Sequence, residues 1–445
     1  MQPTPERFVL ADRHHDPDTG QVKLNYRLDD EHFTETFFMP PGRCATRQRQ
    51  QALDNALDAL HWIAGVSYFK AFCPPRFEAT QRVPTPAQGQ WLDQIYREGL
   101  AEFAHHQGLD RTQFPPAPRC ASDGETANAG SLGLGSVILL PLGGGKDSLV
   151  AWRRLVDQGF GGQIMSVQIG QAPAIQSLAQ SMVARGDVRK HWVIARQLDP
   201  KLQALNARGA MNGHVPITAI NTAALTVLAI LLDAHWVVFA NERSADEPTL
   251  MDASNRPVNH QFSKSWGFEQ LWADWVARYI AQDLRVFSIL RARTELSIAK
   301  TFATMPTYHG EFSSCNRNFH IDPKKRARTR WCGACPKCRF VYLVLAVWMT
   351  PAELVAIFGR DLLADEHAID GFNQLLALDG HKPFECVGQA DEARCAIQSL
   401  SRSDRWASHA VVAALAPKLA SVTVPPIDTL LAIQSPHALP SELQP

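Results

Sequence analysis

The order of apolar and polar positions changes character near residue 136. Before that point, residues 7 to 39 contain two runs in which apolar and polar side chains alternate, separated by turn-forming aspartates and a glycine. Such alternation predicts a hairpin or a small sheet. Residues 47 to 72 and 91 to 106 have the apolar spacing of helices. The segment from 118 to 135 is rich in Gly, Ser, Ala and Asn and is predicted to be a linker.

After the linker, short apolar runs typical of strands alternate with helical patterns. Strands are expected at residues 137–140, 164–169, 192–195 and 236–240, and two of the helices at 175–183 and 217–232. This alternation predicts an α/β fold with a parallel, doubly wound sheet. We expect four parts, namely an amino-terminal α+β domain (1–130), an α/β domain (136–310), a cysteine-rich segment (311–345) and a helical carboxyl-terminal region (346–445).

Charge and hydropathy narrow the class of protein. The 44 basic residues (Lys and Arg) equal the 44 acidic residues, so the formal net charge at pH 7 is zero. Without a global positive field, nucleic acid is not the expected partner. The first 30 residues lack the apolar core of a signal peptide, and the longest apolar stretch, around Ala223–Leu232, is too short to span a bilayer. We expect a cytoplasmic protein that does not insert into a membrane.

A glycine-rich loop follows the first expected strand of the α/β part. Within residues 136–150, an apolar run is followed by Gly143-Gly144-Gly145. Lys146, Asp147 and Ser148 come next, and a helical pattern begins after them. Consecutive glycines let a backbone turn sharply and approach a ligand closely, and the N-terminus of a helix attracts phosphate. Lys146 can neutralise charge, Asp147 can hold Mg²⁺ or orient the loop, and Ser148 can donate its hydroxyl.

The glycine loop is not a Walker A loop. That motif needs Ser or Thr directly after Gly-Lys, and here Asp147 follows Lys146. The segment resembles instead the Ser-Gly-Gly-x-Asp-Ser signature of the pyrophosphate-loop (adenine nucleotide alpha-hydrolase-like) ATP pyrophosphatases, except that Gly143 replaces the first serine. The resemblance implies ATP with Mg²⁺, cleaved to AMP and diphosphate. The alternative is a glycine turn that only packs a strand against a helix.

Four cysteines cluster late in the chain. Cys315, Cys332, Cys335 and Cys338 have the spacing C-x16-C-x2-C-x2-C. Thiolates two residues apart can bind one metal, and four of them form a closed tetrahedral Zn²⁺ site of structural type. Metal-free structural thiols and a redox or sulfur-carrying role, which would need an exposed thiolate of low pKa, are the alternatives.

Three further polar segments are candidates for the site. Asn241, Glu242 and Arg243 follow an expected strand, and ligands bind at the carboxyl ends of strands in open parallel sheets; a solvated loop is the alternative. His214 precedes the apolar helix and lies either in its N-cap region or against substrate. His260 belongs to a polar cluster that is either a surface loop or a substrate contact.

Together these motifs resemble one family, the bacterial UDP-N-acetylmuramoyl-L-alanyl-L-glutamate epimerases of the MurL type. The resemblance covers most of the chain, and it is narrowed by two segments, Glu-Phe-Ser-Ser-Cys-Asn-Arg at 311–317 and Trp-Cys-Gly-x-Cys-Pro-Lys-Cys-Arg-Phe at 331–340. It implies that ATP is cleaved to AMP and diphosphate while the terminal L-glutamate of a nucleotide-sugar dipeptide, a peptidoglycan precursor, becomes D-glutamate through an acyl-adenylate.

The resemblance also implies roles for residues, but it does not identify the acid and the base at the α-carbon. Lys146, Asp147 and Ser148 would act on ATP. Candidates for the proton transfer are His214, His260, Lys300 and Glu311. Two other functions remain open, a tRNA- or base-modifying ligase or thiolase that adenylates its substrate, and a nucleotide-binding zinc protein without activity. The basic run from Lys324 to Arg330 is the feature that favours the ligase.

Overall fold

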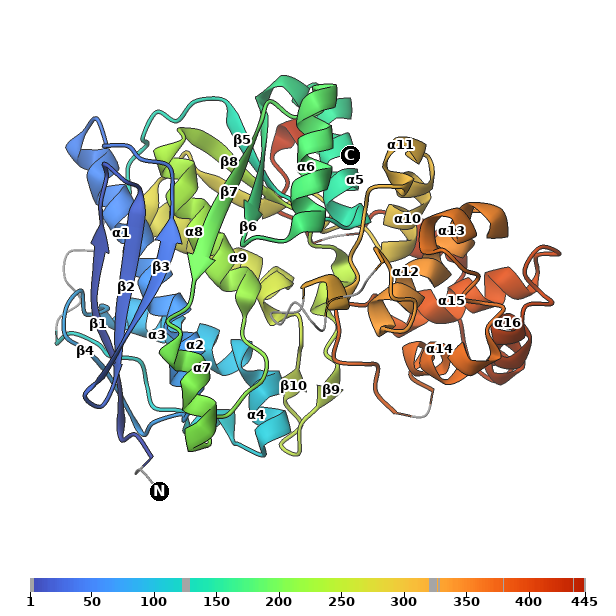
Figure 1. Cartoon of the computed structure of the whole chain (residues 1–445), viewed down its shortest axis with the longest axis horizontal. Helices are drawn as coiled ribbons and strands as arrows, with labels where there is room; N and C mark the ends of the chain where they lie inside the picture. The colour runs from blue at the N-terminus through green and yellow to red at the C-terminus, as the bar shows by residue number, and fades with distance from the viewer. Residues whose placement is uncertain are drawn as a thin grey trace. The chain divides into compact units, whose positions relative to one another are not determined.

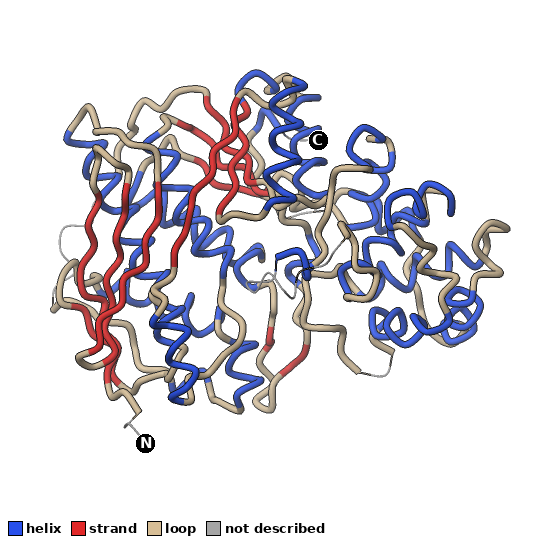
Figure 2. Tube along the Cα trace, in the orientation of Figure 1, coloured by secondary structure: helices blue, strands red, loops and turns tan. Residues whose placement is uncertain are grey.

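The computed structural model describes residues 4–121, 129–319, 326, 329–378, 380–434 and 436–443. Its main feature is a nine-stranded sheet with the strand order β11-β8-β5-β6-β7-β3-β2-β1-β4. Figure 2 shows the strands in red. The strands are β1 (Arg7–His15), β2 (Gln21–Leu28), β3 (Glu31–Phe38), β4 (Arg76–Ala79), β5 (Val137–Pro141), β6 (Ile164–Ile169), β7 (Lys190–Gln197), β8 (Ala234–Phe239) and β11 (Arg285–Ser288). The predicted α/β class is confirmed.

The strand order explains why the glycine loop lies where it does. β5 is central, with β6 on one side and β8 on the other, and β5 pairs in parallel with β8. The chain therefore builds the sheet outward from β5 in one direction and then returns to extend it in the other. Ligands of open α/β sheets bind where the strand order reverses in this way. The loops that follow β5 and β8 both leave from that point.

The expected strands are present, and the expected helices are divided more finely. The helical pattern at 47–72 forms α1 (Arg47–Ala64) and α2 (Val66–Phe69), and the pattern at 91–106 forms α3 (Pro86–Gly99) and α4 (Ala101–Gln107). α3 begins earlier than predicted because Thr85 and Gln88 form a capping box before the apolar stripe begins.

The chain forms two compact units. The first comprises residues 1–139, 192–237 and 251–287, and the second comprises 140–191, 238–250 and 288–445. In the first unit, α1 packs against α8 (Ile217–Leu231) and lies beside β1 (Figure 1). Its core contains a group of interlocking aromatic rings from Phe8, Tyr26, Phe69, Phe77 and Tyr96.

In the second unit, α5 (Lys146–Asp157) packs against α10 (Glu295–Ala303), and α10 packs against α12 (Pro336–Ala346). α12 also contacts α14 (Ile369–Leu376) and α15 (Ala390–Ser401), so the carboxyl-terminal region is helical as predicted (Figure 1). The remaining elements are α6 (Pro173–Arg185), α7 (Lys201–Ala204), β9 (Leu250–Met251), β10 (Pro257–Val258), α9 (Trp266–Trp275), α11 (Pro306–His309), α13 (Pro351–Phe358), α16 (Ala410–Leu415) and α17 (Ile427–Leu431). Among the described residues, none of these helices combines the length and the apolar character needed to cross a membrane.

Candidate functional site

The glycine loop connects β5 to α5 and ends at the first turn of that helix. Gly144 has a φ of +80°, which favours glycine. Gly145 is the N-cap of α5, and because it has no side chain, no capping side chain covers the first N–H groups of the helix. A twelve-residue helix whose first turn is uncapped in this way is suited to bind an anion such as a phosphate.

The segment 311–317 packs directly on the glycine loop. The backbone N–H of Ser313 donates to the carbonyl oxygen of Gly144 at 2.8 Å. A Cβ atom at Gly144 would lie 3.0 Å from the carbonyl oxygen of Ser313, and one at Gly145 would lie 3.2 Å from Cβ of Ser314. Both glycines therefore allow the two backbones to approach closely, and the glycine loop and the segment 311–317 form one piece of structure.

Lys146 is buried and forms ion pairs with protein carboxylates. Its ammonium group contacts Asp147 and Glu295, and its relative exposure is 1%. Burial acts to lower the pKa of Lys146, but the charges of Asp147 and Glu295 outweigh it and raise that pKa. Ser148 is also buried, and its hydroxyl donates to the carbonyl oxygen of Gly145 at 3.1 Å. Lys146 thus binds the helix start to α10.

A buried group of charged side chains lies behind the glycine loop. We call Lys146, Glu242, Glu295, Lys337 and Glu392 the carboxylate–lysine cluster. Lys337 Nζ lies 3.6 Å from the carboxylate of Glu295. Burial, followed by the charge of Glu295, raises the pKa of Glu392 to about 8 and also raises the pKa of Glu242. Glu392 is therefore mostly protonated at neutral pH, which offsets the excess of carboxylates over lysines.

The segment after β8 contributes to this cluster through Glu242. The Glu242 carboxylate accepts hydrogen bonds from the Ser244 hydroxyl at 2.7 Å and from the backbone N–H of Ala245 at 3.2 Å. Its backbone carbonyl accepts from the Arg291 guanidinium at 2.9 Å. The guanidinium of Arg243 donates to the side chain of Gln389 at 3.4 Å. Asn241, which precedes Glu242, is half-buried. The predicted segment therefore lies at the carboxyl end of β8, and Glu242 faces the interior.

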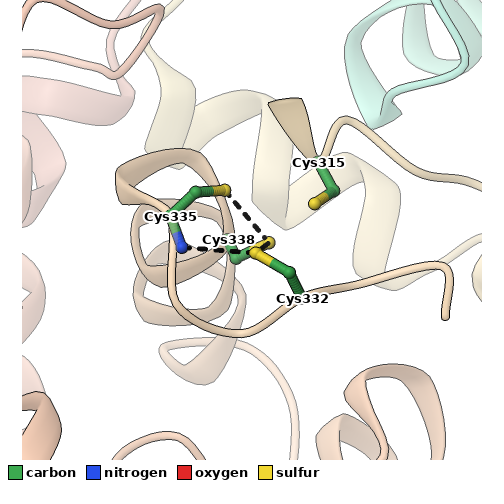
Figure 3. Close-up of side chains that lie close together, drawn as sticks. All are labelled: Cys315, Cys332, Cys335 and Cys338. Carbon is green, nitrogen blue, oxygen red and sulfur yellow. Dashed lines mark hydrogen bonds between the residues drawn. The ribbon is translucent and has the colours of Figure 1, made fainter. Parts of the chain in front are cut away.

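The four predicted cysteine ligands come together in the second unit, and Figure 3 shows their sulfur atoms gathered around one point. The Sγ atoms of Cys332 and Cys338 are 3.8 Å apart and those of Cys335 and Cys338 are 3.4 Å apart. Tetrahedral Zn²⁺ with Zn–S bonds of about 2.3 Å requires sulfur atoms roughly 3.8 Å apart. The residues present therefore fit a metal ion. We call Cys315, Cys332, Cys335 and Cys338 the cysteine knuckle.

Local backbone geometry positions the knuckle. Gly333 has a φ of +66°, which turns the chain between the first two cysteines of the short repeat. The backbone N–H groups of Ala334 and Cys335 then point at Cys332 Sγ, at 3.4 and 3.3 Å. Cys335 is the N-cap of α12, so Cys338 follows on the first turn of that helix.

His214 and His260 lie close together in the first unit. Both are close to the carboxylate of Glu102, a residue that the sequence analysis did not single out. His260 Nδ1 hydrogen-bonds to Glu102 Oε2, and His214 Nδ1 lies 3.4 Å from the same oxygen. The two imidazole rings have centroids 4.7 Å apart. Burial, helped by the neighbouring His260, lowers the pKa of His214 to about 4, so its imidazole is neutral. We call Glu102, His214 and His260 the histidine cluster. No local sequence pattern marks Glu102, which lies on α4.

The other two proton-transfer candidates lie in the second unit and have partners. Both carboxylate oxygens of Glu311 accept from the Arg185 guanidinium, at 2.8 and 3.1 Å. The ammonium of Lys300 lies over the ring of Trp348, 5.3 Å from its centroid. Within the basic run, Lys324, Lys325 and Arg328 lie outside the described residues.

Glu295, Lys337 and Glu392 were not foreseen either. Glu295 begins a helix that is otherwise largely apolar, where a glutamate ordinarily faces solvent and serves the helix dipole. Lys337 is enclosed in the Cys-Pro-Lys-Cys segment, and that position beside the cysteines was the one available signal.

Comparison with known proteins agrees with the resemblance inferred from the motifs. Residues 1–289 match the family model described as MurL N-terminal domain, and residues 311–428 match the MurL C-terminal domain. A UDP-N-acetyl-alpha-D-muramoyl-L-alanyl-L-glutamate epimerase of Xanthomonas oryzae pv. oryzae is 40% identical over 96% of this chain and 94% of its own. Proteins of the same name from a Micromonospora species and from Salinispora tropica are 36% and 35% identical, over 89% and 92% of this chain and 87% and 88% of theirs. The chain belongs to the MurL family.

Proposed function

We propose that this protein converts the terminal L-glutamate of UDP-N-acetylmuramoyl-L-Ala-L-Glu to D-glutamate in peptidoglycan precursor synthesis, with cleavage of ATP to AMP and diphosphate. The observation that carries the proposal is the likeness to epimerases at 35–40% identity along nearly the whole of both chains.

The glycine loop supports the use of ATP. The backbone of Gly143–Gly145 and the uncapped start of α5 would hold phosphate groups. Asp147 and Glu242 offer carboxylate oxygens, which Mg²⁺ prefers, and Asn241 and Arg243 follow the neighbouring strand end. When bound, Mg²⁺ neutralises phosphate charge. Lys146 is committed to Asp147 and Glu295, so we assign it the role of fixing the helix start rather than of contacting phosphate.

Activation by ATP answers a chemical difficulty. Removing a proton next to a carboxylate creates an enolate with added negative charge, and general acid/base help supplies only about 10²- to 10⁴-fold. Transfer of AMP to the α-carboxylate removes that charge and yields an acyl-adenylate with a more acidic α-proton. Removal of that proton, reprotonation on the other face and hydrolysis then complete the epimerisation. The roles of His214, His260 and Glu311 in the proton transfer stay predictions.

The decisive experiment follows both products at once. The purified protein is incubated with UDP-N-acetylmuramoyl-L-Ala-L-Glu, ATP and Mg²⁺ in D₂O, and AMP, D-glutamate and deuterium at the α-carbon are measured. We expect D-glutamate to form with AMP release, to carry α-deuterium, and to be absent with an α,β-methylene analogue of ATP. α-Deuterium incorporation at full rate without any nucleotide would contradict the adenylation, and AMP release that depends on tRNA would contradict the substrate.

A further inference from the structure

We propose that the histidine cluster of the first unit binds a divalent transition-metal ion of the zinc class. The site is distinct from the cysteine knuckle, and the proposal does not rest on the epimerase function. Oε2 of Glu102 forms a hydrogen bond with Nδ1 of His260. The same oxygen lies 3.4 Å from Nδ1 of His214. One ligand atom of each residue lies within 4.8 Å of the ligand atoms of the other two.

These spacings suit a metal ion. Zinc bonds to imidazole nitrogen and carboxylate oxygen are about 2.0 to 2.2 Å long, so neighbouring ligand atoms lie roughly 3.0 to 3.5 Å apart. The 3.4 Å separation between His214 and Glu102 already has this value. The ion would replace the proton that His260 shares with Glu102. Two imidazoles and one carboxylate are a ligand set used for zinc and for ferrous iron, and three protein ligands leave a position open for water or another ligand.

The three ligands come from segments that other contacts of the protein already hold in place. The side chain of Gln107 on α4 donates to the carbonyl oxygen of Asn212 at 3.1 Å, which ties the loop of His214 to the helix of Glu102. Gly213 has a φ of +152°, and a Cβ atom there would lie 3.0 Å from Phe103. Asn259 accepts from the backbone N–H of Gln261 at 2.7 Å and so forms the turn that carries His260. A ligand set fixed before binding loses little entropy when the ion enters.

Charge and burial favour a metal held through nitrogen. The side chains of Glu102, His214 and His260 are 10%, 18% and 15% exposed, so competing water is limited but an entry route remains. Only one of the three ligands is a carboxylate, which disfavours hard cations such as Mg²⁺ that are held mainly by oxygen atoms. Imidazole ligands prefer zinc and its transition-metal neighbours.

Cobalt titration of the metal-stripped full chain tests the proposal, because Co²⁺ reports its ligands by absorption. Thiolate ligands in the cysteine knuckle give intense sulfur-to-cobalt charge-transfer bands, whereas nitrogen and oxygen ligands give only weak ligand-field bands. We expect two equivalents of Co²⁺, one with each signature. Glu102→Gln and His260→Ala should weaken the second equivalent at least about a hundredfold and preserve the charge-transfer bands. Cys335→Ser should do the reverse.

His105→Ala is the matched control, since it removes an exposed imidazole from the same helix, and it should keep both equivalents. Near-ultraviolet circular dichroism of each stripped variant establishes that the fold persists. Should the parent protein bind only the thiolate-type equivalent, the proposal is overturned without recourse to any variant. It is equally overturned if Glu102→Gln keeps the second equivalent. A third outcome that overturns it is loss of epimerase activity in His214 and His260 variants of a parent that takes up no second ion. That last result would favour the predicted proton transfer instead.

Discussion

The carboxylate–lysine cluster and the cysteine knuckle both place polar side chains in the interior of the second unit. The two sites differ in how the charge of these side chains is balanced. In the cluster, opposite charges meet directly, because Lys146 contacts Asp147 and Glu295 while Lys337 approaches Glu295. In the knuckle, the sulfur atoms contact one another and backbone N–H groups. Four thiolates in one place would repel, so we expect them to ionise only when a cation from outside the chain balances their charge.

This contrast separates two kinds of dependence. The carboxylate–lysine cluster is complete within the protein, so it should withstand chelators and respond to substitution of a single partner. The knuckle should be sensitive to chelators, because structural metal binding is coupled to folding. The cluster also borders the glycine loop, so substitutions in the cluster should lower the rate of the reaction. Substitutions in the knuckle should mainly lower the free energy of unfolding.

The largest expected effect is on activity, at the border between the cluster and the glycine loop. Asp147→Asn and Ser148→Ala should each lower ATP cleavage at least about 10²-fold, the cost typical of removing one electrostatic group from an active site. Circular dichroism should match the parent protein, since both changes conserve shape, although each variant loses a contact at the start of α5 and should unfold at a somewhat lower temperature. Activity at the parental rate in a folded variant would remove the loop from the mechanism. Asp157→Asn, at the far end of α5, is the control and should leave activity unchanged.

Next in size is the effect of removing one partner from the cluster. Glu295→Gln leaves two buried ammonium groups short of negative charge, and breaking a buried ion pair costs about 3 to 5 kcal/mol. Both side chains of the Lys146–Glu295 pair are 2% exposed, so solvent screens the pair little. Urea unfolding measures the loss, with exposed Glu366→Gln as the control. Adding Lys146→Met to Glu295→Gln should recover part of the stability, and failure to do so would show that charge imbalance is not the cause.

The knuckle gives a smaller effect that depends on the metal. We expect one zinc per chain in the knuckle, and we expect Cys335→Ser to weaken its binding about a hundredfold, which removes up to about 2.7 kcal/mol of stabilisation. Metal analysis and unfolding with and without a chelator measure both quantities. The chelator should destabilise the parent and the Glu295→Gln variant alike, but Cys335→Ser much less. Unchanged stability of the parent after complete removal of zinc would contradict a structural metal.

Sequence alone identified the parts of the site whose residues are close together in the chain. The glycine loop and the Cys332–Cys338 repeat are read within a few residues, because the backbone turn and the ligand spacing are local properties. The strands β5 and β8 were found from apolar runs, and their order in the sheet then placed Glu242 beside the loop.

Partners that meet only through tertiary packing were not predictable. Glu295 and Glu392 are separated by almost a hundred residues, and Glu102 meets His214 and His260 from a third segment. Each of these glutamates looks locally like an ordinary helical surface residue, since Glu is a good helix former that is usually exposed. Their burial depends on which helix faces are covered, and a single sequence does not record that.

The smallest expected effect concerns the pH dependence of stability within the cluster. Glu392 accepts backbone hydrogen bonds from Leu296 at 3.1 Å and Gln389 at 2.9 Å, and it faces Glu295 and Glu242. Burial raises the pKa of Glu392 in the folded chain to about 8, from its ordinary value of 4.5. Between these values the unfolded chain has lost the proton that the folded chain keeps. The folded state therefore loses relative stability as pH rises through this window, and the loss ends above about pH 8.

One proton of difference corresponds to a slope of about 1.4 kcal/mol per pH unit at most. Glu392→Gln lacks the proton and removes this slope, although its amide cannot accept both backbone hydrogen bonds and so lowers stability by a constant amount. The free energy of unfolding of the parent minus that of the variant should therefore fall as pH rises from about 5.5 to 7.5 and level off above about pH 8. Exposed Glu366→Gln should show no such trend. A parent–variant difference that is flat with pH would mean that Glu392 is ionised in the folded chain, and would contradict the prediction.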